Sequence, residues 1–327
     1  DVNISGALTL NGANANVPYG GGRGDESILK PSTTGRAPIN LGAGYDNVTI
    51  NGFEITANMS TNAIYCGVNG PSYLDIKFNY IHDIGTQIIT QNIYAINYRG
   101  GPDDDDDRTN VNVSDNYFNE IYNHLASENG KGSSAAIWFG QSNGEGTVSN
   151  VTIERNVITN VRSNLNTKSF EPTPYDDVHK ITTSGIYFGI GWKDIGKVSG
   201  AIIQDNTITN IIGGSAYGIQ LSGNTPGLNI QNNVFDNVSS PEEPSYSYGI
   251  GITSTNHHES DLVTINENSI TNSSIGVSNT SGNAVDAICN WWGTNVPSDV
   301  AALISGSVTY IPWLIDGTYD SPETGFQ

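Results

Sequence analysis

A short pattern of apolar and polar residues recurs along almost the whole chain, and it limits the fold more than any other feature of the sequence. In each copy two apolar residues flank a polar one, an Asn follows three positions later, and another apolar residue comes two positions after the Asn. The clear copies begin at Leu74, Val111, Val151, Ala201, Leu228 and Val263, with Asn79, Asn116, Asn156, Asn206, Asn233 and Asn268. A copy at Val48 has Gly52 in the Asn place, and Asn290 with Trp292 closes the series. Such self-similarity indicates a repeat architecture, in which each unit packs only against its neighbours.

The pattern has a direct physical meaning for a β-strand. Alternation of apolar and polar residues turns one side chain toward a core and the next toward solvent. The recurrent Asn is expected where the chain must bend, because Asn tolerates a left-handed backbone and hydrogen-bonds its own turn. If successive copies stack in register, the Asn side chains form a ladder of amides that satisfy one another inside the bend.

A second strand-like segment accompanies each copy of the first. Its members are centred on Ile64, Ile96, Ile137, Ile186, Ile219, Ile250 and Val277. Successive copies lie about 27 to about 50 residues apart, so the loops between strands absorb the variation in length. The chain is therefore predicted to be all-β: a right-handed, single-stranded parallel β-helix solenoid of about eight coils with long inserted loops.

One solenoid domain accounts for all 327 residues. We expect an N-terminal coil region at 1–45, central repeats at 46–283 and a C-terminal closing segment at 284–327. Cys66 and Cys289 fall roughly seven coils apart, or about 33 Å at about 4.8 Å per coil, which is beyond disulfide reach. They are expected to be two buried, inert thiols.

The two ends of the chain and its repeats resemble a known group of proteins. The closing run from Asn290 to Thr294, with Val308 to Leu314 after it, is similar to the last segment of many bacterial surface β-helix proteins. The opening run from Leu8 to Ala15, followed by Arg23 to Ser27, resembles their early coils. The chain resembles the right-handed parallel β-helix superfamily of bacterial or archaeal cell surfaces, with NosD-type and polysaccharide-lyase-type repeats. This resemblance implies the fold, whereas the roles of those proteins differ widely.

The charge of the chain excludes some partners. The formal net charge is −20, with only 13 Lys and Arg residues, so nucleic acid would be repelled. The acidity serves solubility or the binding of Ca²⁺. Because no run of about 18 apolar residues occurs, no membrane insertion is expected. The chain opens at Asp1 in strand-like sequence, as though an export signal or upstream region had been removed, and we expect a secreted or cell-surface protein.

The residues that follow the central Ile of the second strand are expected to form an outward column. They include three aromatic and two amide side chains, and Trp192 lies on an adjoining loop; the set is Tyr65, Asn97, Trp138, Tyr187, Gln220 and Trp192. Aromatic faces beside amides suit stacking on sugar rings with hydrogen bonds to hydroxyl groups. The column is therefore a candidate binding site for a polysaccharide or cell-surface glycan. The alternative is that long loops fold over these rings and bury them.

Runs of carboxylates are candidate Ca²⁺ ligands. Five consecutive aspartates, Asp103, Asp104, Asp105, Asp106 and Asp107, repel one another unless a cation or solvent relieves them. Asp75, Asp83 and Glu120 are candidate neighbours for further oxygen ligands. A second pair, Asp176 and Asp177, lies in the longest insertion. The alternative is a solvated acidic loop without a metal.

The insertion at 162–184 also carries the residue types that catalysis on an acidic glycan needs. For β-elimination, Lys180 or Arg162 would be the base, Tyr175 or His179 the proton donor, and Asp176 with Asp177 the Ca²⁺ site. Hydrolysis would instead need two carboxylates about 5 to 10 Å apart, for which Asp176, Asp177 and Glu120 are candidates. The sequence lacks the motifs of pectate lyases, polygalacturonases and mannuronan epimerases, so the alternative is a structural loop.

Three functions remain open from the sequence. The first is an extracellular surface protein that binds carbohydrate or mediates adhesion without catalysis. The second is a Ca²⁺-assisted polysaccharide lyase or glycoside hydrolase. The third is a structural subunit of a surface layer or filament, because open strand edges invite end-to-end self-assembly. Two small motifs, Arg23-Gly24-Asp25 and the His82–Asp83 surface pair, are not expected to carry the function.

Overall fold

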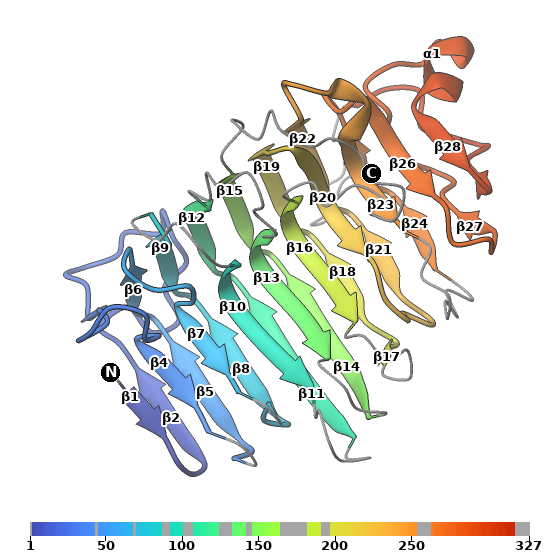
Figure 1. Cartoon of the computed structure of the whole chain (residues 1–327). Helices are drawn as coiled ribbons and strands as arrows, with labels where there is room; N and C mark the ends of the chain where they lie inside the picture. Colours follow the sequence, from blue (N-terminus) through green and yellow to red (C-terminus); the bar gives the residue numbers. More distant parts are fainter. Residues whose placement is uncertain are drawn as a thin grey trace, which may run out of the picture.

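The chain folds into a parallel β-helix, as a computed structural model shows for residues 2–42, 45–67, 70–86, 92–100, 107–123, 133–141, 146–163, 182–190, 197–253 and 263–317. Its strands form three sheets, here called sheets A, B and C, and the pairings between neighbouring strands are parallel. The chain passes through sheets A, B and C in the same order in each coil, so successive coils stack along one axis (Figure 1). The predicted all-β fold is confirmed.

Sheet A has ten strands and contains the second-strand segments. They are β1 (Val2–Ile4), β4 (Ile39–Leu41), β7 (Ile64–Cys66), β10 (Ile93–Gly100), β13 (Ser133–Gln141), β16 (Thr182–Ile190), β20 (Ser215–Leu221), β23 (Ser247–Ile252), β26 (Ile275–Asn279) and β28 (Ile304–Gly306).

Sheet B has eleven strands and contains the first part of the repeated pattern. They are β2 (Leu8–Asn11), β5 (Val48–Asn51), β8 (Leu74–Lys77), β11 (Arg108–Ser114), β14 (Thr147–Glu154), β17 (Lys197–Ser199), β18 (Ile202–Gln204), β21 (Asn229–Gln231), β24 (Thr264–Asn266), β27 (Val285–Asp286) and β29 (Val308–Thr309). The short strand β17 pairs with β14, and its Lys197 also forms a parallel bridge with Asn224.

Sheet C has eight strands, and all but the first two follow a repeated Asn. They are β3 (Ile28–Leu29), β6 (Glu54–Ala57), β9 (Tyr80–Ile84), β12 (Tyr117–Asn123), β15 (Val157–Ser163), β19 (Thr207–Ile212), β22 (Val234–Ser239) and β25 (Ser269–Ile270). The repeated pattern therefore spans two strands. The sequence did not separate them because only a short bend lies between, so one continuous pattern covers both.

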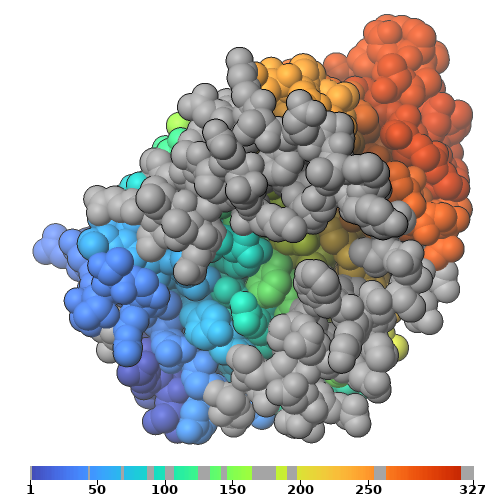
Figure 2. Space-filling model, viewed as in Figure 1, coloured from blue at the N-terminus to red at the C-terminus, as the bar shows by residue number. Residues whose placement is uncertain are grey.

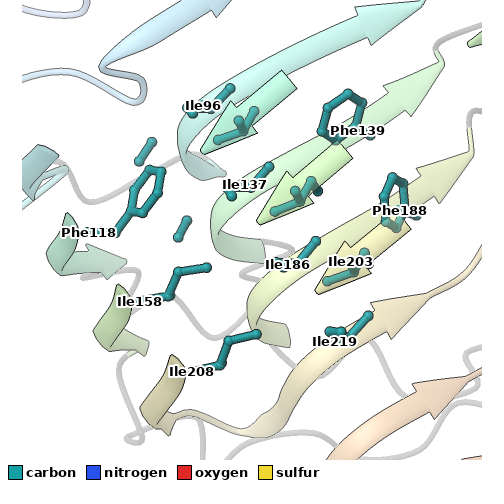
Figure 3. Close-up of a cluster of buried hydrophobic side chains, with 14 of the residues drawn as sticks. Ile96, Phe118, Ile137, Phe139, Ile158, Ile186, Phe188, Ile203, Ile208 and Ile219 are labelled. Atoms are coloured by element: carbon teal, nitrogen blue, oxygen red, sulfur yellow. The ribbon is translucent and has the colours of Figure 1, made fainter. Parts of the chain in front are cut away.

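The core consists of columns of like residues stacked from coil to coil. Ile96, Ile137, Ile186 and Ile219 of sheet A follow one another, and Phe118, Ile158 and Ile208 of sheet C face them (Figure 3). All of these side chains are buried. Burial of apolar surface in these columns stabilises the fold by about 25 cal/mol per Å². The repeated apolar positions therefore supply the main contribution to the stability of the solenoid.

The predicted amide ladder lies at the bend between sheets B and C. Asn116 Oδ1 accepts hydrogen bonds from the backbone N and the Nδ2 of Asn79, both at 3.0 Å, and Asn156 Oδ1 does the same for Asn116. The same two bonds recur upward through Asn206, Asn233, Asn268 and Asn290. The ladder thus satisfies buried amides that would otherwise each cost about 1–3 kcal/mol.

The prediction that the recurrent Asn itself takes the left-handed backbone conformation is wrong. The left-handed backbone belongs to the residue before each ladder Asn, namely Phe78, Asp115, Arg155, Asp205, Asn232, Glu267 and Cys289. The Asn itself is required for its side-chain hydrogen bonds. In the copy at Val48, register places Phe53 opposite Asn79, while Gly52 lies at the left-handed position, so the Asn place was assigned one residue too early.

The last coils contain a buried indole and a short helix. Trp292 is buried there, and the short helix α1 (Pro297–Ala302) buries Val300. A one-turn 3₁₀ helix, η1 (Pro244–Tyr246), precedes β23. Both cysteines are free, as predicted, but only Cys66 is fully buried, which raises the pKa of its thiol; Cys289 is half-buried.

Candidate functional site

The predicted outward column exists as a continuous row on the outer face of sheet A. Register pairs Tyr65 with Asn97, Asn97 with Trp138, Trp138 with Tyr187, and Tyr187 with Gln220. The residues on either side of each, such as Ile137 and Phe139, point into the core. The structure therefore brings five of the six predicted binding residues together, whereas Trp192 lies outside the described residues.

Two further side chains join this row. The ring of Tyr94 stacks on that of Trp138 with centroids 4.8 Å apart and an interplanar angle of 5°. The guanidinium of Arg99 lies 5.9 Å from the ring centre of Tyr65 and 5.8 Å from that of Trp138. Here the outer surface formed by Tyr65, Tyr94, Asn97, Arg99, Trp138 and Tyr187 is called the aromatic face.

Outward-facing glycines let the rings lie flat on the sheet. Gly140 and Gly189 follow Trp138 and Tyr187 by two residues and so share their side of the strands. A Cβ at Gly189 would lie 2.8 Å from Cζ of Tyr187 and 3.0 Å from Nε1 of Trp138, and one at Gly140 would overlap the indole. The absence of side chains at these positions leaves broad ring surfaces along the strands, the geometry that stacking on a sugar ring uses.

A pocket of about 350 Å³ continues the aromatic face toward the N-terminus. Its lining residues are Asn3, Gly35, Arg36, Ala37, Asn40, Asn62 and Tyr65. Asn3, Asn40 and Tyr65 occupy the same register column as Asn97, so pocket and face form one surface. Figure 2 shows this side of the molecule, where described residues from the blue to green part of the chain reach the surface.

Part of the aromatic face is covered. Asn97 and Gln220 are buried, whereas Tyr65 and Trp138 are half-buried. The Nδ2 of Asn97 donates a hydrogen bond to Oδ1 of Asn62 at 2.9 Å. The Oδ1 of Asn97 is buried and has no hydrogen-bond partner among the described residues. Burial raises the pKa of Tyr94 and of Tyr187, so both phenols stay neutral hydrogen-bonding groups. Within the face, Tyr65 and Trp138 are therefore more open than Tyr94 and Asn97, which are buried.

The outer face of sheet B differs in chemistry. A groove of about 510 Å³ crosses it, with hydroxyl and amide side chains from successive coils. We call this surface the polar face; it comprises Asn47, Thr49, Tyr73, Asp75, Asn110, Asn112, Asn150 and Thr152. Its carboxylate is already engaged, because Asp75 accepts from Lys77 at 2.7 Å and from Asn112 at 2.8 Å.

The predicted catalytic and metal residues are only partly described. Lys180, His179, Tyr175, Asp176, Asp177 and Asp103 to Asp106 lie outside the described residues. Arg162 lies on β15 of sheet C, where it approaches Glu120 at 3.4 Å, so it does not share the aromatic face. Asp107 is exposed and accepts a hydrogen bond from the backbone N of Thr147 at 2.9 Å.

The candidate neighbours for a Ca²⁺ site are divided between two sheets. Asp75 lies on sheet B, whereas Asp83 and Glu120 lie on sheet C, and each has a basic or imidazole partner. Within the described part of the chain, no three His, Cys, Asp or Glu residues are grouped as metal ligands. Asp75 is therefore separate from Asp83 and Glu120, which lie at equivalent positions of neighbouring strands. The Ca²⁺ site at the aspartate run stays a prediction.

The two minor motifs have structural partners. Arg23 forms an ion pair with Glu26 at 2.7 Å and donates to the carbonyl of Phe78 at 2.8 Å, so its guanidinium is not displayed. His82 stacks on Tyr80 and contacts Asp83 at 2.7 Å and Glu54 at 3.2 Å. It belongs to a half-buried cluster on sheet C rather than to an isolated surface pair.

The fold and the aromatic face define a class: a parallel β-helix protein with a ring-lined outer surface. Comparison with known proteins gives no match to a family model, a curated protein or a solved structure. Among the described residues, no helix has the length and apolar character needed to cross a membrane.

Proposed function

We propose that this protein is an extracellular surface β-helix protein that binds carbohydrate on its aromatic face and catalyses no reaction. One observation carries the proposal: Tyr65, Tyr94, Trp138 and Arg99 form one stacked cluster beside a polar pocket. Ring faces supply the apolar contact that a sugar ring requires, and nearby amides supply hydrogen bonds to its hydroxyl groups.

The flatness of the cluster supports a polymeric ligand. Strands of sheet A are about 4.8 Å apart, so an extended chain along the solenoid axis meets one side chain per coil. Asn40, Tyr65, Asn97 and Trp138 form such a series over four coils. A polysaccharide that follows this row would gain several weak contacts at once, which is how a shallow surface reaches useful affinity.

The experiment is a panel of neutral and acidic polysaccharides, tested with the full chain for binding and for polymer length. Binding with an intact polymer, weakened by Trp138→Ala, is the expected result. A shortened polymer would contradict the non-catalytic function and favour the lyase or hydrolase. Thr152→Ala is the matched control, because Thr152 lies in the same coil on the polar face.

A further inference from the structure

Basic side chains gather around the N-terminal part of the aromatic face. Arg36 lines the pocket that contains Tyr65, and Arg99 lies over the ring of Tyr65 from the other side. Lys30 lies apart from this face, in a pocket of about 470 Å³ that Thr56, Asn58 and Met59 also line. In a chain with 13 basic residues and a net charge of −20, two cations around one surface form a local exception.

Arg36 and Arg99 differ from several other basic residues of the molecule in their partners. Arg23 pairs with Glu26, Lys77 with Asp75, and Arg155 with Asp115, all at 2.8 Å or less. By contrast, Lys30, Arg36 and Arg99 form no ion pair with any residue that the structure describes.

Arg99 contains a donor that no described residue satisfies. Tyr65 and Trp138 both lie within cation–π distance of its guanidinium, and its Nε is buried without a hydrogen-bond partner among the described residues. An unsatisfied buried donor destabilises the fold, and a charged one does so more strongly. A ligand oxygen that reached this donor would remove the penalty. The planar guanidinium fits carboxylate and similar oxyanions, because two N–H groups can bond two oxygens in parallel.

We propose that the carbohydrate on the aromatic face is anionic, and that Arg99 and Arg36 bind its carboxylate or sulfate groups on either side of Tyr65. This inference rests on the proposed function and narrows it to one ligand class. The rings hold the sugar, while the two cations select charged sugars over neutral ones. Such selection also offsets the repulsion between an acidic polymer and the rest of this acidic chain.

The test compares polymers that differ only in charge. The probes are a 1,4-linked polyuronate, the neutral polymer made from it by carboxyl reduction, sulfated dextran and plain dextran. Wild type should bind at least one anionic polymer about tenfold more tightly than its neutral counterpart, with affinity that falls as salt rises. The polyuronate and sulfated-dextran arms decide whether the group is a carboxylate or a sulfate.

Arg99→Gln and Arg36→Gln should each lose about tenfold in affinity for the anionic polymer and leave affinity for the neutral one unchanged. Lys197→Gln is the control, because it removes the same charge from β17 of sheet B. Thermal unfolding of each variant shows that the fold is retained. Arg99→Lys keeps the charge without the two-pronged geometry and should recover only part of the affinity.

Two results would overturn the inference in distinguishable ways. If the neutral polymer binds as tightly as the anionic one, or if both Gln variants bind the anionic polymer like wild type, anion recognition is wrong while carbohydrate binding stands. If none of the four polymers binds, the proposed function fails and the inference fails with it.

Discussion

The outer faces of sheets A and B run side by side along the same solenoid, yet they present different chemistry. The aromatic face brings together rings and a guanidinium group, because Tyr94 and Arg99 both contact Trp138. The polar face stacks short hydroxyl and amide side chains, and its charges at Asp75 and Lys77 neutralise each other. Both faces have the same spacing from coil to coil, because the same backbone repeat sets it.

The difference shows what the repeat dictates and what it leaves free. Inward positions must pack against the next coil, so they are apolar, and most are Ile, Val, Leu, Phe or Ala. Outward positions have no such requirement and can differ between faces at little cost in stability. A face that accumulates large rings, outward glycines and cations without described ion-pair partners is therefore the better candidate for function than one whose polar groups bond each other.

The largest effect is expected from the feature that both faces share. Asn156→Ala removes a side chain that bonds Asn116, Asn206 and the carbonyl of Val113, and it leaves several buried groups unsatisfied. The free energy of unfolding should fall by about 3–5 kcal/mol. Asn112→Ala on the polar face should cost only about 1 kcal/mol. Chemical denaturation measures both; equal losses would show that the ladder has no special role.

Binding should separate the two faces next. Trp138→Ala should weaken polysaccharide binding by about 10- to 100-fold, because the indole is the largest ring surface of the cluster. Thr152→Ala, in the same coil on the polar face, should leave affinity unchanged. Calorimetric titration of both variants gives the comparison, and a reversed order would move the binding site to the polar face.

A smaller change should show whether the rings must lie flat. Gly189→Ala places a Cβ against the rings of Tyr187 and Trp138 and forces them to shift. Affinity should fall a few-fold, by about 1 kcal/mol or less, with little loss of stability. Gly6→Ala is the control, since a Cβ there meets no atom within 4 Å. Unchanged binding by the Gly189 variant would mean that ring position is unimportant.

The smallest expected effect concerns pH. Burial raises the pKa of Tyr94 and of Tyr187 on the aromatic face, and burial also raises the pKa of Tyr80 on sheet C, to about 12. The pKa of each of these phenols is higher in the folded protein than in the unfolded chain, where it is about 10. Their contribution to the free energy of unfolding is therefore fully present below about pH 10. That stability is lost as pH rises above about 10. Tyrosinate absorbance, followed with unfolding, should rise later in folded than in denatured protein; coincident curves would contradict this.

Much of the fold follows from the sequence because the repeat is a direct consequence of packing. Alternation identified sheets A and B, and it placed Tyr65, Asn97, Trp138, Tyr187 and Gln220 in one column. The right-handed sense and the 1–327 domain boundaries stay predictions. Sheet C was hidden because its strands continue the pattern of sheet B through a short bend.

The site was less accessible to sequence reasoning. Arg99 follows Asn97 by two residues on one strand, so alternation alone would have placed it on the aromatic face. Tyr94 is different: Ala95 and Ile96 both point into the core, and this break in alternation turns Tyr94 outward onto Trp138. Arg36 lies in a loop, where no periodicity fixes the direction of a side chain.

The most direct test of the account is hydroxyl-radical footprinting of the protein with and without a polysaccharide that it binds. Tyr73 on the polar face is 53% exposed, which makes it an internal reference beside Trp138 and Tyr65. The account predicts that the polymer protects Trp138 and Tyr65 from oxidation and leaves Tyr73 as reactive as in the free protein. Protection of Tyr73 with no change at Trp138 and Tyr65 would contradict it.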